Sequence, residues 1–255
     1  MPIAGNLDYA LTRVHARHGQ RMDEAGWRRL ESARDLGQYL AAVRSTPLAD
    51  WANGFDPERD CHTFERALRI EWRSYVDRVA GWHPLAWQAW LAWLAWLPGL
   101  SLLAQLARRE PAPAWMLADP VYGPLAPGTP ADRAAALART VLAPLQSAVA
   151  GRITVSEAWQ AHWHGLRPSP DARTQHSLEL LLQAMREHEQ SLASATDSGE
   201  PARAELASRL QRLLRIAAGT VIVTTCHLGL VALDLERLRG GLARRRLFAG
   251  QAERH

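Results

Sequence analysis

The spacing of apolar residues is the feature of this sequence that most restricts its fold. Over most of the chain, apolar side chains recur at every third or fourth position, the repeat of an α-helix with one buried face. Residues 7–22, for example, place Leu7, Leu11 and Val14 on one stripe. Only Val221 to Thr225, a β-branched run, fits a strand by propensity, and it has no evident partner strand. We therefore expect an all-α helical bundle or repeat of roughly 8–11 helices.

Proline residues and capping residues set the expected helix boundaries. Ser45-Thr46-Pro47 and Asp56-Pro57 each combine a capping side chain with a proline, which is typical of a helix start, and Ser156 is a candidate cap. The expected helices cover residues 7–22, 24–43, 47–53, 58–80, 84–108, 131–149 with an interruption at Pro144, 154–164, 171–193, 202–218 and 219–248.

A segment rich in proline divides the sequence into two halves. Residues 110–130 contain six prolines and two glycines, so they cannot form one continuous helix, and we expect a linker or long loop there. The expected halves are 1–109 and 131–255. Each half closes with an apolar helix followed by arginines, and the segments that begin at His62 and His176 resemble each other. An internal repeat and shared helical patterning both explain this similarity.

Two stretches without formal charge, 84–107 and 216–233, raise the question of a membrane protein. By length, the first qualifies as a spanning segment. However, Pro98-Gly99 divides it, and its tryptophans run through the middle, whereas an interfacial belt would place them at the ends. Helices packed on all sides by protein are the favoured interpretation. A true span, and a surface that touches a membrane, remain the alternatives.

The charged residues narrow the classes of partner. All 30 basic residues are arginine. Two causes explain this bias: a GC-rich coding sequence, or selection for planar contacts to carboxylate and phosphate groups. Acidic residues are interspersed among them, so no nucleic-acid footprint is expected. Cys61 and Cys226 form no CxxC pair, and the N-terminus lacks the pattern of a signal peptide. We expect a cytoplasmic protein.

Motifs that carry chemistry are absent from the sequence. It contains no Gly-rich phosphate loop, no GxSxG and no HExxH. His15 and His18, His162 and His164, and His188 between two glutamates are the best metal candidates, but a site needs three or four converging ligands. We expect no catalytic residue, no metal and no cofactor, and therefore no enzyme.

The candidate partner-binding residues are arginines and tryptophans. Arg244, Arg245 and Arg246 form the densest basic cluster, and Arg108 and Arg109 follow the apolar helix of the first half. A solvated helix end explains such a cluster as well as an acidic partner or lipid head groups do. Trp93 and Trp96 belong to a series with a tryptophan at every third residue, which favours a helical core over an aromatic groove for a partner helix.

Several of these features follow one another in a recognisable order. The first half contains Tyr9 with Arg13 and Arg17, then Leu36, Tyr39 and Leu40, then Ser45-Thr46-Pro47 with Leu48. Next comes a helix with Glu65, Leu68, Glu71 and Tyr75, and a closing helix with Asp234, Glu236, Arg237, Leu238 and Arg239. In this order the chain resembles the C-subunit family of the V-type ATPases, also called the d-subunit family, in a diverged and shortened form.

The resemblance implies a non-catalytic role in ion transport, including proton transport. Members of that family form a helical funnel, a rotor cap of the central stalk, which sits on the membrane rotor ring and receives the central shaft. The resemblance therefore implies ring and shaft proteins as partners and a peripheral position at the inner face of the membrane. Arginines could pair there with acidic loops or lipid head groups.

Two other functions remain open from the residues. One is a helical adaptor or regulatory binding protein unrelated to ATPases. The other is an all-α enzyme whose cavity contains histidine, with His15, His18 or Glu65 as candidates.

Overall fold

The protein is all-helical, as predicted. The computed structural model describes residues 6–108, 110–194 and 199–252, the last five of these by their backbone alone. Helices make up 74% of the structure, and no strand occurs within the described ranges. The β-branched run at 221–225 enters the final helix, α13 (Ile222–Ala252), so its propensity for strand is overridden by packing.

The chain divides into two compact units. The first consists of Met1–Trp87 together with Ser169–His255, and the second of Gln88–Pro168. The first unit is therefore discontinuous in sequence, and the second is an insertion in it. These boundaries differ from the expected halves, because the proline-rich segment 110–130 lies inside the second unit. That segment contains two short helical pieces and no continuous helix.

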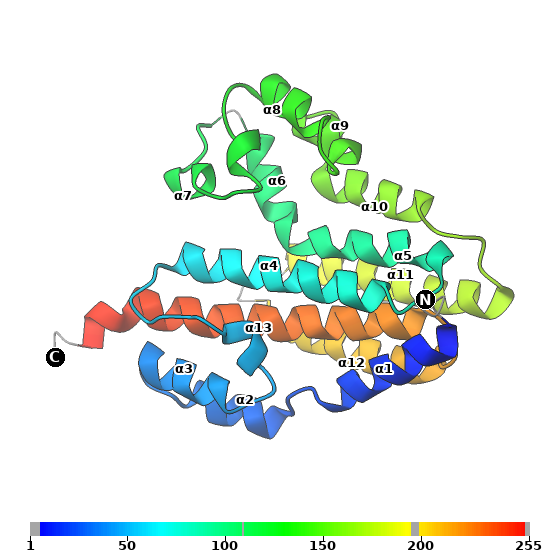
Figure 1. Cartoon of the computed structure of the whole chain (residues 1–255), viewed down its shortest axis with the longest axis horizontal. Helices are drawn as coiled ribbons and strands as arrows, with labels where there is room; N and C mark the ends of the chain where they lie inside the picture. The colour runs from blue at the N-terminus through cyan, green and yellow to red at the C-terminus, as the bar shows by residue number, and fades with distance from the viewer. Residues whose placement is uncertain (1–5, 109, 195–198, 253–255) are drawn as a thin grey trace, which may run out of the picture. The chain divides into compact units, whose positions relative to one another are not determined.

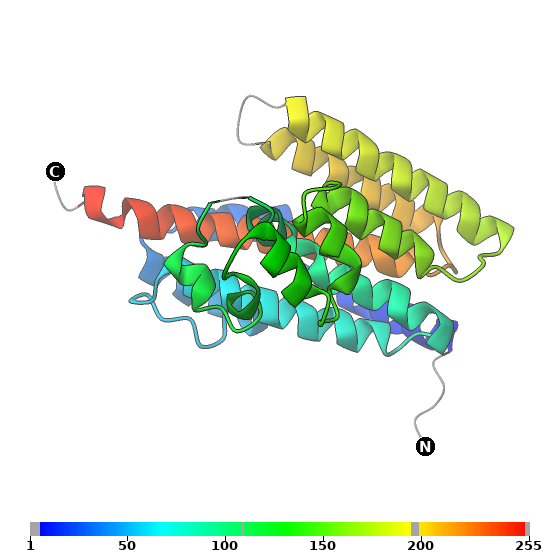
Figure 2. The ribbon, with the colours of Figure 1, turned by 90° about the horizontal axis from the view of Figure 1, so that it is seen from above.

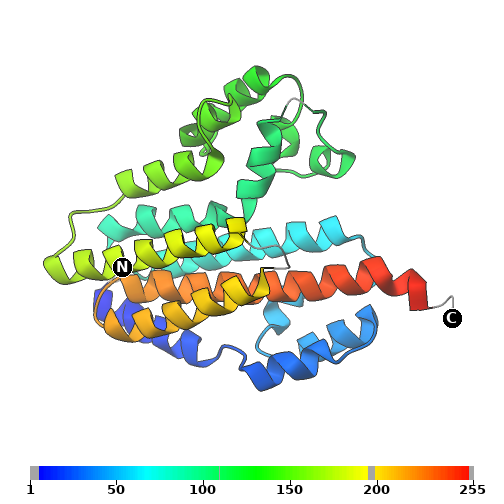
Figure 3. The same cartoon turned by 180° about the vertical axis from the view of Figure 1, so that it is seen from behind.

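The first unit is built around its last helix. Besides α13 it contains α1 (Leu7–Gly19), α2 (Glu24–Glu31), α3 (Leu36–Arg44), the 3₁₀ turn η1 (Ala49–Ala52), α4 (Cys61–Ala80), α11 (Ala172–Ser194) and α12 (Glu200–Ile216). α13 contacts α1, α3, α4, α11 and α12. Figure 1 shows α4 and α13 side by side, and Figure 3 shows α12 lying along α13 from the other side. In Figure 2, α11 and α12 form a hairpin.

Burial explains why α13 occupies the centre. Val223, Cys226 and His227 are fully buried, and so are Leu230 and Leu238 further along the helix. Apolar side chains cover nearly every side of its first half, which is typical of a helix surrounded by others.

Side-chain caps determine where the helices of the first unit begin. Asn6, Asp23, Asp35 and Asp60 each accept a hydrogen bond from a backbone N–H of the first turn of α1, α2, α3 or α4. The single helix predicted over 24–43 is wrong for this reason. It is two helices, because Asp35 caps α3 by accepting from the Gln38 N–H. The predicted cap Ser156 is also wrong, since Thr154 caps α10 (Val155–Gly165) in a reciprocal capping box with Glu157.

The long apolar segment of the sequence is broken into three pieces. α5 (Leu85–Ala92) is followed by the 3₁₀ helix η2 (Trp93–Gly99), which contains Pro98, and by α6 (Leu100–Leu106). Of the described residues, Leu85–Leu106 alone is apolar and long enough to cross a membrane by length and composition, and half of its 18-residue window is buried. The remaining elements of the second unit are α7 (Ala114–Leu117), η3 (Gly123–Leu125), α8 (Pro130–Leu137), η4 (Ala143–Leu145), α9 (Gln146–Val149) and α10.

Stacked tryptophans form the core of the second unit. The rings of Trp90 and Trp163 stack with centroids 4.7 Å apart, and Trp159 stacks on Trp163 at 5.6 Å. The indole N–H of Trp163 donates to the carbonyl of Trp90, and that of Trp93 donates to the carbonyl of Trp159. These bonds tie α5 and η2 to α10.

Candidate functional site

A polar recess of about 920 Å³ opens on the first unit. Its walls are the end of α1 and the residues that follow it, the turn at 46–53, one face of α4 and the first half of α13. Its volume lies within the range of small-molecule sites, between about 300 and 1,000 Å³. Its lining mixes arginines and carboxylates with aromatic rings, so it differs from the apolar pockets that hold most hydrophobic ligands.

The turn at one wall is fixed by its own side chains. The Thr46 hydroxyl donates to the Val43 carbonyl at 2.7 Å and accepts from the Leu48 N–H at 3.2 Å. Pro47 fixes the backbone between them. Leu48 is buried and anchors this turn, which brings Asp50 and Trp51 to the recess.

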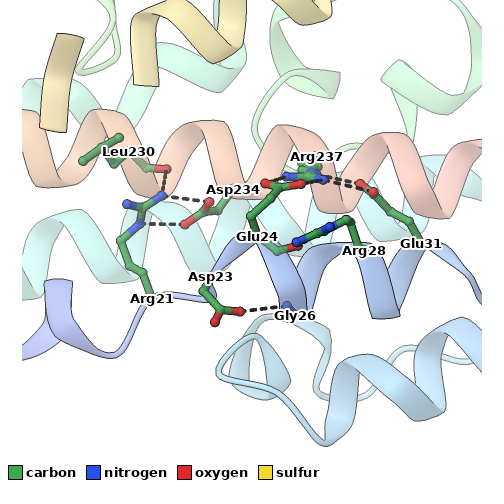
Figure 4. A network of polar contacts seen from close by, with 9 residues as sticks. All are labelled: Arg21, Asp23, Glu24, Gly26, Arg28, Glu31, Leu230, Asp234 and Arg237. Carbon is green, nitrogen blue, oxygen red and sulfur yellow. Dashed lines mark hydrogen bonds and ion pairs between the residues drawn. The ribbon is translucent and has the colours of Figure 1, made fainter. Parts of the chain in front are cut away.

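An arginine–aspartate pair closes one side of the recess. Arg21, two residues beyond the end of α1, binds both carboxylate oxygens of Asp234 on α13, at 2.7 and 2.9 Å, and donates to the Leu230 carbonyl (Figure 4). Burial raises the pKa of Asp234, and the Arg21 guanidinium partly offsets this. Bidentate geometry of this kind holds α1 against α13.

A second arginine of α13 clamps α2. Arg237 donates to both oxygens of Glu24 and to both oxygens of Glu31, at distances between 2.6 and 3.0 Å (Figure 4). Its guanidinium also lies 4.7 Å from the Trp27 ring centroid. The two glutamates are the first and last residues of α2, about two helical turns apart, and they take opposite sides of one guanidinium.

A tyrosine and a buried histidine meet at the inner end of the recess. The Tyr75 hydroxyl of α4 lies 2.7 Å from Nε2 of His227 on α13, and His227 is fully buried. Burial lowers the pKa of His227 to about 3, and the neighbouring His18 and arginines act in the same direction. The ring of His18 contacts that of His227 edge-on, with centroids 5.9 Å apart. At neutral pH His227 is therefore uncharged.

Solvent-exposed charges line the mouth of the recess. Arg17 comes from α1 and Arg78 from α4, while Asp50 and Glu71 supply carboxylates. The Arg17 guanidinium makes one long hydrogen bond, 3.5 Å, to Gln20. These exposed groups are available to a binding partner, whereas Arg21 and Asp234 neutralise each other.

Comparisons with protein-family models, with curated proteins and with solved structures gave no match. The resemblance to the C-subunit family therefore rests on the residues themselves. Several of the residues that carry it line the recess: Arg17, Thr46, Pro47, Leu48, Glu71, Tyr75 and Asp234. They come from segments that are far apart in the sequence.

The predicted arginine cluster at 244–246 has two exposed members and one buried member. Arg244 and Arg246 are exposed, and Arg246 makes one long bond to the Glu58 carbonyl. Arg245 is buried, donates to the carbonyls of Glu31, Ala33 and Gly241, and lies 4.0 Å from the Tyr39 ring centroid. Its guanidinium is used inside the fold, which leaves Arg244 and Arg246 as the exposed candidates for a partner.

Three of the other predicted contact residues, Arg108, Trp93 and Trp96, lie in the second unit. Arg108 is exposed, and its carbonyl accepts a hydrogen bond from the buried Arg133. Arg109 lies outside the described residues. Trp93 is buried and bonded to α10, and Trp96 is half-buried. Of the two tryptophans, only Trp96 presents part of its surface to solvent.

The candidate histidines are dispersed. His162 packs on the Trp93 ring and His188 contacts the Ala202 carbonyl, whereas the ring of His18 packs edge-on against His227. Within the described ranges, no three His, Cys, Asp or Glu side chains gather in an arrangement that could hold a metal ion.

Sequence reasoning misses several residues that define the recess. Arg21, Arg78 and His227 belong to no motif, although His227 interrupts an otherwise apolar stretch and Asp234 follows it two helical turns later. A histidine and an aspartate on a central, buried helix require polar partners. The need of His227 and Asp234 for polar partners could therefore have been predicted from the sequence, but the identity of those partners could not.

Proposed function

We propose that this protein is a non-catalytic coupling component related to the C-subunit family of the V-type ATPases, and that the recess of the first unit is a partner-binding site. The observation that carries the proposal is the convergence of the residues behind the resemblance. Arg17 on α1, the Thr46–Leu48 turn, Glu71 and Tyr75 on α4, and Asp234 on α13 meet at one recess. Exposed arginines at its mouth suit carboxylates of a partner protein.

The ion pairs around α13 also support a coupling role. Arg21 and Arg237 tie α13 to the segment 21–31, Arg239 pairs with Glu65 of α4, and Arg203 of α12 pairs with Glu236. A component that transmits torque needs helices that do not slide past one another. Each exposed pair contributes little alone, but together they fix the register of four helices.

The chemistry of the recess favours binding over catalysis. Its histidine, His227, has a pKa lowered to about 3 by burial, so it would be a weak general base near neutral pH. A histidine-containing active site is therefore the weaker hypothesis for this cavity. We place the protein at the cytoplasmic face of the membrane complex, in contact with ring and shaft proteins.

Affinity purification from gently solubilised membranes of the native host tests the proposal. Tagged protein should recover rotor-ring and shaft proteins of a V-type ATPase, identified by mass spectrometry. The double variant Arg17→Gln/Arg78→Gln should reduce this recovery if the recess is the contact, and Arg244→Ser/Arg246→Ser should reduce it if the exposed end of α13 is. Arg186→Gln, an exposed arginine on α11, is the matched control. A preparation without ATPase components would refute the proposal.

A further inference from the structure

The inner end of the recess concentrates hydrogen-bond donors. Tyr75 is half-buried there, and the charges that act on its hydroxyl are the guanidinium groups of Arg17, Arg78 and Arg21, each of which lowers its pKa against the larger effect of burial. Arg21 is committed to Asp234. Arg17 and Arg78 are exposed, and Arg17 would give up only its long 3.5 Å hydrogen bond to Gln20 on turning toward a ligand.

The proton arrangement of His227 makes Tyr75 a donor toward the recess. Nδ1 of His227 is buried without a partner. An unpaired buried N–H is rarer than an unpaired acceptor, so we assign the single ring proton to Nε2. Nε2–H then donates to the Tyr75 oxygen over the observed 2.7 Å. The hydroxyl proton of Tyr75 is left to point away from the histidine, into the recess that Tyr75 lines.

We propose that the recess binds an oxyanion, a carboxylate or a phosphate group, beside the Tyr75 hydroxyl, with Arg17, Arg78 and that hydroxyl as its ligands. Two guanidinium groups and a hydroxyl supply the donors that such a group accepts. Asp234, the buried carboxylate of the recess, is held by Arg21, so it does not compete for Arg17 and Arg78. Leu48, Trp51 and Leu235 give the ligand an apolar wall.

The inference holds whether or not the chain belongs to an ATPase, because the purified chain alone can be tested. Inorganic phosphate and succinate are titrated into the full-length protein at constant ionic strength, and binding is followed by calorimetry and by the thermal midpoint. Sodium chloride of matched ionic strength is the blank. We expect saturable binding of at least one anion.

Variants decide whether the anion occupies the proposed position. Arg17→Gln/Arg78→Gln should weaken binding by about tenfold or more, because two charged ligands are lost. Tyr75→Phe should weaken it by a smaller factor while preserving the ring. Arg186→Gln should change nothing. Equal weakening by Arg186→Gln would mean that net charge alone attracts the anion, and it would overturn the proposal.

The affinity purification described above, combined with the anion titration, distinguishes a free anion from an acidic side chain of a partner protein. If neither free anion binds, but ATPase components are recovered by the wild type and by Arg186→Gln and lost with Arg17→Gln/Arg78→Gln, the oxyanion is an acidic side chain of the partner. If free anions do not bind and the arginine variants recover partners normally, the anion site is refuted while the coupling role survives. If anions bind and no ATPase component is recovered, the coupling role fails and the site stands.

Discussion

Two buried histidines of the first unit, His83 and His227, are kept neutral by their surroundings. His227 and His83 are both fully buried, and burial lowers the pKa of His83 to about 4 and that of His227 to about 3. Each ring finds a hydroxyl: His83 lies 2.9 Å from the Thr224 hydroxyl, and His227 lies 2.7 Å from that of Tyr75. Two imidazoles that cannot easily take up a proton thus lie on or against α13.

These depressed pKa values predict a loss of stability in mild acid. In the unfolded chain both rings would take up protons near their ordinary pKa of 6.5, whereas the folded protein resists protonation down to about 4 and about 3. The two neutral histidines therefore leave the free energy of unfolding at its full value above pH 6.5. Below that pH the free energy of unfolding falls, because the unfolded chain takes up protons that the folded protein does not. Each histidine should contribute a slope of about 1.4 kcal/mol per pH unit between roughly pH 6 and 4.5.

Urea unfolding at several pH values measures this slope. His227→Gln should remove one histidine's share of it, whatever its effect on stability at pH 7. An identical slope in the wild type and His227→Gln would show that His227 takes up its proton freely in the folded state.

At the scale of the elements, α13 approaches α3 closely at one glycine. Gly240 and Gly241 are neighbours in the middle of α13, but a methyl group on Gly241 would overlap the buried Tyr39 hydroxyl, while one on Gly240 would meet nothing within 4 Å. Adjacent glycines in one helix thus have opposite roles.

Alanine substitutions should separate these roles. Gly240→Ala should raise the free energy of unfolding by about 0.5–1 kcal/mol, since alanine is the better helix former. Gly241→Ala should lower it by roughly 1–3 kcal/mol, because Tyr39 has no room to move. Denaturant titration of both variants measures the difference. If both substitutions raised the free energy of unfolding, α3 and α13 would be able to move apart at Tyr39 without loss of stability.

The sequence predicts the helices well and the recess poorly, for one physical reason. Helical periodicity is local, so 7–22, 58–80 and 171–193 each correspond to one observed helix with ends shifted by a few residues. The break between α2 and α3 is also readable, since Asp35 is a capping residue. The recess depends on α1, α4 and α13 meeting across about 200 residues of sequence. No local pattern encodes that meeting.

At the scale of the whole molecule, the chain order separates the two units. The tryptophan stack of Trp90, Trp163 and Trp159 lies within the continuous second unit, whereas α1, α3 and α4 need α13 as their partner. A fragment that ends at Pro168 therefore contains all of the second unit and only part of the first.

This fragment, residues 1–168, should keep the stacked indoles and lose the first unit's packing. Coupled indole rings give a strong near-ultraviolet circular dichroism band. We expect that band in the full chain and in the fragment, and its loss from both with Trp163→Phe, whereas amide protons of α1 and α4 should exchange rapidly in the fragment alone. Absence of the band from the fragment would show that the second unit needs residues 169–255.

The order of the elements has a consequence during synthesis, because α13 follows the second unit along the chain. The ribosome finishes the second unit before it synthesises α13, the helix that covers α1, α3 and α4. Translation of residues 169–255 takes roughly 4–17 s at ordinary elongation rates. Throughout that interval the apolar faces of Leu40, Phe64 and Trp72 lack their final cover. We therefore expect these nascent chains to bind a chaperone that recognises exposed apolar segments at the ribosome.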